Sequence, residues 1–219
     1  MTLGKRLLPL LYLPVFLAWY FLLEGRPSEN MIVVASPLDA LIPFDERWVI
    51  AYFAWFPYLL GFIGWLFVKD ARPYREIPRL AFLLIVGMTA CLIGYTLWPT
   101  TQELRPAVYP RPGVLTDVVA SLQGFDDPSN VFPSLHVYTS IVVAHCLATS
   151  RYVRRAWVRV AAWALCALIA ASTCFLKQHS ILDAFGAAGL FVVVWGASRA
   201  MAAARGRRRI GTDAAAARP

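Results

Sequence analysis

The chain has 219 residues, of which 59% are hydrophobic and 16% are charged. A soluble domain carries about 25% charged residues, so this composition excludes an ordinary soluble protein and indicates an integral membrane protein. The net charge of +8 requires no nucleic-acid partner, because the basic residues are distributed as they are in the loops of a membrane protein.

Apolar stretches recur along the chain with a length of about 20 residues, which an α-helix needs to cross a bilayer. They predict six transmembrane helices, and the expected fold class is an all-α integral membrane protein. The expected spans are 7–23, 48–68, 79–98, 132–149, 156–176 and 181–202. The first could pass for a signal peptide, but it has no small-residue cleavage site before Glu24, so we interpret it as an anchor.

The basic residues indicate how these spans are oriented. If all six cross the membrane, both termini lie on the same side. Most lysines and arginines fall on that side, namely Lys5, Arg6 and those in 69–79, 151–159 and 199–218. The positive-inside rule therefore predicts a multi-pass protein of the cell (plasma) membrane with cytoplasmic termini. The loops that carry the motifs below would then face away from the cytoplasm.

We expect one membrane domain over residues 1–204, with no soluble domain appended. The segment 205–219 is basic and of low complexity, which predicts a disordered cytoplasmic tail. All four cysteines fall inside expected spans and form no CxxC motif. We interpret them as small packing residues, so neither a disulfide framework nor a zinc site is expected.

His179 and Asp183 are four residues apart at the start of the last apolar segment. Ionisable groups beside lipid are costly and are usually retained for chemistry. This spacing puts both side chains on one face if the helix begins early enough. The carboxylate can then hold the imidazole in one tautomer and stabilise its positive charge. The alternative is a salt bridge at a helix end that only anchors the segment.

The sequence FPSLH opens the fourth apolar segment and ends at His136. Pro133 suits the first turn of a helix, so Ser134 and His136 are expected near a helix N-terminus. Backbone N–H groups and the helix dipole favour an anion there, and the serine hydroxyl adds a hydrogen-bond donor. The alternative is an ordinary cap beside a buried histidine whose hydrogen bonds are satisfied.

Basic residues on the same predicted side could bind an anion. Lys177 precedes His179 by two residues, and beside a His/Asp pair we interpret it as a phosphate or carboxylate ligand. Arg105 and Arg111 each precede a proline, which stiffens the backbone, and the arginine fork matches phosphate oxygens. We favour a ligand role for Arg105 and interpret Arg111 as a solvated loop charge, and which of the two is the main phosphate ligand of this loop stays open.

Together these residues provide a histidine with an orienting acid, a second histidine, cations and a helix N-terminus. Phosphoryl transfer through a phosphohistidine needs these groups: a positioned nucleophile, positive charge around the phosphoryl oxygens, and a proton for the leaving alkoxide. We expect no metal and no other cofactor, because the cations and the helix dipole can stabilise the charge that develops.

Three motifs then occur in a familiar order. They are Arg105-Pro106, Pro133-Ser134-Leu135-His136, and Ser172 followed by His179 and Asp183. On these motifs the chain resembles the type 2 phosphatidic acid phosphatase (PAP2) superfamily, which also includes vanadium haloperoxidases. The resemblance covers roughly residues 48–200 and implies a PAP2-like helical bundle.

The resemblance also implies a role for each site residue. His179 would be the nucleophile, Asp183 would orient it, and His136 would be the general acid toward the leaving group. The implied phosphate ligands are Arg105, Ser134 and Lys177, the last in place of a family cation that this chain lacks.

The chain departs from the family pattern at three positions. Trp98 stands where the family usually has lysine, Thr173 where it usually has arginine, and Leu135 where it usually has glycine. The forms FPSLHV and KQH…D are more similar to the branch that contains inositol phosphorylceramide synthases.

Three hypotheses about function stay open at this point. The chain is a phosphatase if water takes the phosphoryl group from His179, and a phosphotransferase of the inositolphosphotransferase type if a lipid or polyol hydroxyl takes a phospho-headgroup. The third is a non-catalytic membrane protein that binds lipid phosphates, which the two missing cations would favour. The expected partners are a membrane lipid phosphate and the bilayer; the lipid and the oligomeric state stay open.

Overall fold

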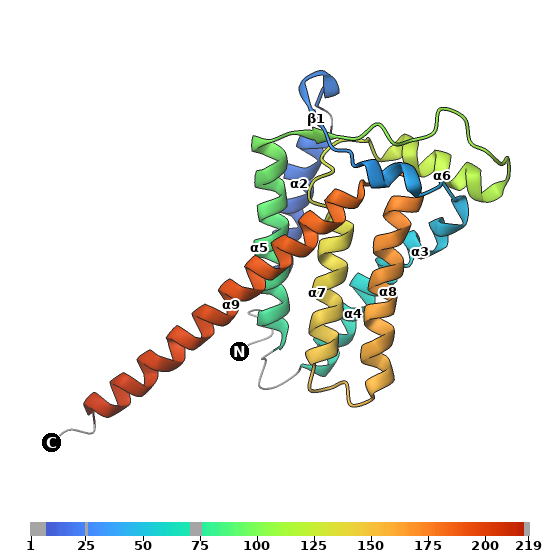
Figure 1. The fold of residues 1–219 in the computed structure, drawn as a ribbon. Helices are drawn as coiled ribbons and strands as arrows, with labels where there is room; N and C mark the ends of the chain where they lie inside the picture. Colours follow the sequence, from blue (N-terminus) through green and yellow to red (C-terminus); the bar gives the residue numbers. More distant parts are fainter. Residues whose placement is uncertain (1–7, 25, 71–75, 217–219) are drawn as a thin grey trace.

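The computed structural model describes residues 8–24, 26–70 and 76–216. Its α-helices are α2 (Tyr12–Glu24), α3 (Val49–Phe53), α4 (Trp55–Lys69), α5 (Glu76–Leu97), α6 (Val114–Phe125), α7 (Leu135–Thr149), α8 (Ala156–Phe175) and α9 (Ile181–Ala216). Figure 1 shows α5, α7 and α8 side by side, with α9 running obliquely across α7 and α5.

Four helical stretches are long and apolar enough to cross a membrane, which supports a helical membrane protein. They are Glu46–Lys69, Glu76–Leu97, Ala156–Phe175 and Ile181–Ala204. The other two expected spans, 7–23 and 132–149, correspond to the shorter apolar helices Leu8–Glu24 and Leu135–Thr149. Length and composition therefore support four of the six expected spans and do not establish the count of six.

Helix α7 lies at the centre of the bundle and packs against α4, α5, α8 and α9. Ser134 caps its first turn by accepting a hydrogen bond from the backbone N–H of Val137, so the helix begins three residues after the expected start of this span. Tyr138 joins α7 to α5: its hydroxyl donates to the carbonyl oxygen of Leu83 at 2.6 Å, and its ring lies against Gly87. A Cβ added at Gly87 would lie 1.9 Å from that ring, so only glycine permits this approach.

One end of the bundle is covered by the connecting segments, and we call it the loop end (residues 26–48, 98–134 and 176–180). Helix α6 lies across it, near the top of Figure 1. The 3₁₀ helices at this end are η2 (Ser28–Asn30), η3 (Pro37–Leu41) and η4 (Glu46–Trp48), whereas η1 (Leu8–Leu11) precedes α2. Strands β1 (Ile32–Val33) and β2 (Thr100–Thr101) form a short parallel pair, which the expected all-α class did not include.

Helix α9 continues to Ala216 and so includes most of the segment expected as a basic tail, 205–219. Residues 217–219 lie outside the described residues. The division into a membrane domain at 1–204 and a disordered tail stays a prediction.

Candidate active site

His179 lies in the tight turn between α8 and α9. Lys177 adopts a left-handed backbone conformation, with φ of 56°, and turns the chain after α8. The backbone N–H groups of Gln178 and His179 then both donate to the carbonyl oxygen of Thr173, at 2.9 and 3.1 Å. The turn therefore fixes the backbone of His179 against the end of α8.

The His179 side chain is held by Asp183, in the first turn of α9. Nδ1 of His179 lies 3.1 Å from Oδ2 of Asp183, which also accepts the backbone N–H of Ser180 at 3.0 Å. The expected pairing is therefore present, although His179 precedes the helix. A carboxylate accepts, so this contact selects the tautomer protonated on Nδ1 and leaves the Nε2 lone pair for a ligand.

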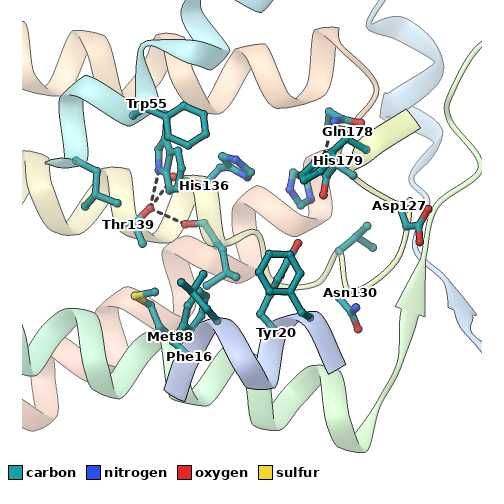
Figure 2. Close-up of a pocket in the computed structure, with 18 of the residues that line it drawn as sticks. Phe16, Tyr20, Trp55, Met88, Asp127, Asn130, His136, Thr139, Gln178 and His179 are labelled. Carbon is teal, nitrogen blue, oxygen red and sulfur yellow. Dashed lines mark hydrogen bonds between the residues drawn. The ribbon is translucent and has the colours of Figure 1, made fainter. Parts of the chain in front are cut away.

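His136 approaches the same place from α7. Its ring lies 4.7 Å from those of both Tyr52 and Trp55, measured between centroids, and 6.0 Å from the ring of His179. Trp55 is itself fixed, because its indole N–H donates to the hydroxyl of Thr139 at 2.8 Å. Figure 2 shows both imidazoles at the same end of a cavity. Two motifs that lie far apart in the sequence thus meet in space.

The cavity has a volume of about 420 Å³ and lies between α2, α4, α5 and α7. Most of its wall is apolar; the apolar residues include Phe16, Leu17, Phe56, Leu59, Met88 and Leu135. Its polar end is lined by Asp126, Asp127, Ser129, Asn130, His136, Gln178 and His179. A polar end that continues into an apolar channel suits an amphipathic ligand whose head lies beside the imidazoles.

The three expected phosphate ligands do not line this cavity. Ser134 is fully buried, and its backbone N–H donates to the carbonyl oxygen of Asp183 at 3.2 Å, which ties the start of α7 to the start of α9. Arg105 donates to the carbonyl oxygens of Gln123 and Asp126, each at 2.7 Å, at the C-terminal end of α6.

Lys177 is likewise occupied by backbone groups. Its Nζ donates to the carbonyl oxygens of Asp39 and Ile42, at 2.7 and 2.5 Å. The lysine therefore ties the turn before α9 to the segment around η3. Long, flexible side chains find such acceptors wherever the fold supplies them, and the sequence spacing carries no information about them.

The family comparison bears on this arrangement, because the sequence model of the PAP2 superfamily matches residues 43–197. The chain belongs to the PAP2 superfamily. No curated protein and no solved structure matches it. Membership supports a phosphatase or phosphotransferase at a coarse level, and it does not distinguish the inositol phosphorylceramide synthase branch from others. The matched range includes both histidines and Asp183.

This PAP2 chain replaces two family cations with uncharged residues. Trp98 is exposed at the end of α5, and the hydroxyl of Thr173 donates to the carbonyl oxygen of Ala170 at 2.8 Å. A cation that the sequence did not single out lies nearby instead. Arg26 donates to the carbonyl oxygen of Tyr95 at 2.6 Å and to Oδ1 of Asn130 at 3.0 Å, and both of these residues line the cavity.

The polar end of this PAP2 cavity also contains carboxylates. Nε2 of Gln178 donates to Oδ2 of Asp126 at 3.2 Å, whereas Oε1 of Gln178 is buried without a hydrogen-bond partner among the described residues. Burial raises the pKa of Asp126, and the nearby His179 and Arg105 offset this only in part. In the described part of the chain, no group of three or more His, Cys, Asp or Glu side chains could hold a metal ion.

Asp39 supports the site from outside the range that the family model matches. Its Oδ2 accepts from the hydroxyl of Ser180 at 2.6 Å, and its Oδ1 accepts from the backbone N–H of Ile181 at 2.8 Å. The carboxylate thus caps the first turn of α9, two residues after His179. The spacing Ser36-x-x-Asp39 could have predicted a local capping box, which is present, but not a contact across 141 positions.

Proposed function

We propose that this chain is a metal-independent lipid phosphate phosphohydrolase or phosphotransferase that acts through a phosphohistidine on His179. The observation that carries the proposal is the meeting of the two imidazoles at the polar end of an apolar cavity. Superfamily membership supports the same class of reaction.

In the first half-reaction, the Nε2 lone pair of His179 attacks the phosphorus atom. The bond between phosphorus and the lipid oxygen breaks, and His136, in its protonated imidazolium form, gives a proton to the departing alkoxide and becomes neutral. Asp183 stabilises the positive charge on His179. In the second half-reaction a water molecule attacks the phosphohistidine, His136 takes the water's proton, and the N–P bond breaks to release inorganic phosphate.

The phosphoryl oxygens need positive charge, and the start of α7 supplies part of it. We retain Ser134 and Arg105 as proposed contributors: Ser134 by fixing the helix N-terminus, and Arg105 through a guanidinium close to Asp126. For Lys177 the two carbonyl contacts favour a positioning role over phosphate binding. Arg26, which touches two cavity residues, is the better proposed cation.

The apolar part of the cavity favours a lipid over a soluble phosphate ester. Aromatic and aliphatic side chains from α2, α4 and α5 provide a surface for an acyl or prenyl chain. With the orientation that the basic residues predict, the loop end and its substrate head would lie at the extracytoplasmic leaflet.

Transfer to a hydroxyl is a second candidate, and the acceptors at the polar end favour it. Hydroxyl groups of a polyol would donate hydrogen bonds to Asp126, Asp127 and Oε1 of Gln178, which has no partner among the described residues, whereas these acceptors would repel a phosphate dianion. The phosphohistidine half-reaction is then unchanged, and the hydroxyl of a lipid or polyol replaces water as the attacking group.

The test uses the purified full chain in detergent with phosphatidate, a polyprenyl diphosphate, a phosphatidylglycerol phosphate and a phosphoinositide. Phosphate release without an alcohol supports hydrolysis, whereas product formation that requires an alcohol supports transfer. The His179→Ala variant should be inactive. The matched control is His145→Ala. In the parent protein, the imidazole of His145 contacts Arg79 at the opposite end of α7.

The same experiment addresses the non-catalytic hypothesis. If the parent protein turns over none of the four lipids but binds one of them, and His179→Ala binds it equally well, the protein is a lipid-phosphate binder. That result would overturn the proposed enzyme, because a binder needs no nucleophile with an orienting carboxylate.

A further inference from the structure

A second apolar cavity lies between α4, α7 and α8, away from the candidate active site. Its volume is about 740 Å³. The wall on α4 is formed by Pro57, Tyr58, Phe62 and Trp65, and the opposite wall includes Leu147, Val158 and Leu165. It reaches the connection between α7 and α8, which lies at the far end from β1 and α6 in Figure 1. We call it the α4–α8 groove.

The length of the α4–α8 groove matches one leaflet of a bilayer. Its lining residues run from Ala54 to Trp65, which is three helical turns, or about 16 Å. The hydrocarbon core of a bilayer is about 30 Å thick, so half of it is about 15 Å. A single acyl chain of one leaflet would therefore fill the groove along its length.

Two arginines stand at the end of the groove beside the α7–α8 connection. Arg154 and Arg155 line it and are exposed, and neither side chain makes a hydrogen bond or ion pair with any residue that the structure describes. Neighbouring arginines differ: Arg151 pairs with Asp70 at 3.3 Å, and Arg159 donates to the carbonyl oxygen of Val153 at 2.7 Å. The fold thus gives two of these arginine side chains partners, whereas the two at the groove have none among the described residues.

The groove lining contains no acidic residue in the part of the chain that the structure describes. Aromatic side chains flank the charged end, with the rings of Trp65 and Tyr152 edge to face at 6.3 Å. Such rings are characteristic of the boundary between acyl chains and head groups. The groove therefore matches an anionic phospholipid part by part. Its apolar channel would hold the acyl chain, its aromatic rings would lie at the boundary with the head group, and its two arginines would face the phosphate.

We propose that the α4–α8 groove binds one anionic phospholipid, with an acyl chain along α4 and the phosphate on Arg154 and Arg155. The occupant is a lipid of the surrounding bilayer and not a second copy of this chain. A twofold interface through the groove would bring the same two uncompensated arginines of both copies together. The proposal is independent of the proposed enzyme, because no residue of the candidate active site lines the groove.

The test measures lipids retained by the purified full chain with native mass spectrometry, after equilibration with phosphatidylglycerol or phosphatidylcholine. We expect the parent to retain one phosphatidylglycerol in preference to phosphatidylcholine. Arg154→Gln and Arg155→Gln should each reduce this preference about fivefold. Arg199→Gln removes one charge from an exposed position on α9 away from the groove, and it should leave the preference unchanged.

A second variant tests the apolar wall. Val158→Trp places an indole in the groove with both arginines intact, and we expect it to reduce retention of either lipid. An equal effect of Arg199→Gln, or full retention in the Arg154→Gln/Arg155→Gln double variant, would overturn the proposal. So would a change from dimer to monomer caused by Val158→Trp, since the occupant would then be a second copy. If Val158→Trp fails to fold, the exposed arginine variants decide the question.

Discussion

His136 and His179 face each other at 6.0 Å between ring centroids, yet the protein holds their rings by different means. His179 is bound through Nδ1 to a buried carboxylate, whereas His136 is packed between the rings of Tyr52 and Trp55. A carboxylate stabilises an imidazole that becomes positively charged, and an aromatic enclosure favours a neutral one. The carboxylate favours His179 as the nucleophile in the proposed reaction. His136 can act as the acid only when it is protonated, and the negative charge of a bound substrate phosphate would stabilise that imidazolium against the cost of its aromatic enclosure.

We expect His136→Gln to affect substrates according to their leaving groups. A lipid alkoxide needs a proton, so turnover of a lipid phosphate should fall about 10²- to 10⁴-fold. A nitrophenolate leaves without protonation, and turnover of p-nitrophenyl phosphate should fall by less than about tenfold. Initial rates with both substrates check this. Equal losses would show that His136 does not protonate the leaving group, and His145→Gln serves as the control.

Asp183→Asn should lower kcat strongly while KM changes little. The amide can donate to Nδ1 of His179, which favours the tautomer protonated on Nε2 and removes the attacking lone pair. A loss of about 10³- to 10⁴-fold in kcat is expected by analogy with other oriented histidines. Steady-state kinetics measure the division between kcat and KM. The control is Asp117→Asn, an exposed position on α6, and a change confined to KM would contradict the orienting role.

Activity should persist in EDTA, and vanadate should inhibit it. Vanadate adopts the five-coordinate geometry that the phosphoryl group has in the transition state, so it should bind where His179 attacks the phosphorus atom. Competition with the lipid substrate, and loss of vanadate binding in His179→Ala, would support this. An activity that EDTA abolishes and zinc or magnesium restores would contradict the metal-free mechanism.

The contacts that the sequence predicted are those set by local geometry. The four-residue spacing of His179 and Asp183 brings their side chains together at the start of α9, where His179 precedes the helix and Asp183 lies in its first turn. The sequence placed Ser134 only near a helix N-terminus and did not predict that Ser134 itself is the cap, although this contact is also local. The family motifs placed His136 near His179, which no local rule could do, because α7 and the start of α9 meet only through packing.

The partners of the long basic side chains could not be predicted. The side chains of Arg105 and Lys177 both donate to carbonyl oxygens of other segments, although Nε of Arg105 is buried without a hydrogen-bond partner among the described residues. For Asp39, the sequence could have predicted the local capping box but not the contact with Ser180. The number of membrane spans is also open, because α7 is shorter than the apolar run that predicted it.

Asp39→Asn should lower kcat through the position of His179 and not through substrate binding. The amide has one oxygen and one NH2 group, so it cannot accept at both positions and one of the bonds to Ser180 and Ile181 is lost. We expect kcat to fall about tenfold, since small displacements of a reacting group are costly, with KM within about twofold. A parallel loss of lipid binding would instead indicate a general structural defect.

The matched comparison for Asp39 is Lys177→Gln, which removes the other tie between the η3 segment and the His179 turn. If positioning is the shared cause, both variants lower kcat at unchanged KM, and the double variant loses less than the product of the single effects. If the loss of kcat in the double variant instead equals the product of the single effects, the two contacts act independently and do not share one positioning role.

Asp126→Asn should stabilise the protein at neutral pH. Burial raises the pKa of Asp126 above its unfolded value of about 3.9, so the folded state binds the proton more tightly than the unfolded state. The free energy of unfolding therefore falls as pH rises from about 3.9 through the folded-state pKa, and it stays lower above that pKa. A neutral amide avoids this loss.

Thermal unfolding in detergent across pH measures the effect. At pH 7 we expect Asp126→Asn to raise Tm by about 2 to 4 °C, and the difference should disappear below about pH 3.9, where the aspartate is protonated in both states. Asp117→Asn, on the exposed side of α6, should not reproduce this pH dependence. A lower Tm for Asp126→Asn at pH 7 would mean that His179 and Arg105 stabilise the carboxylate by more than its burial costs.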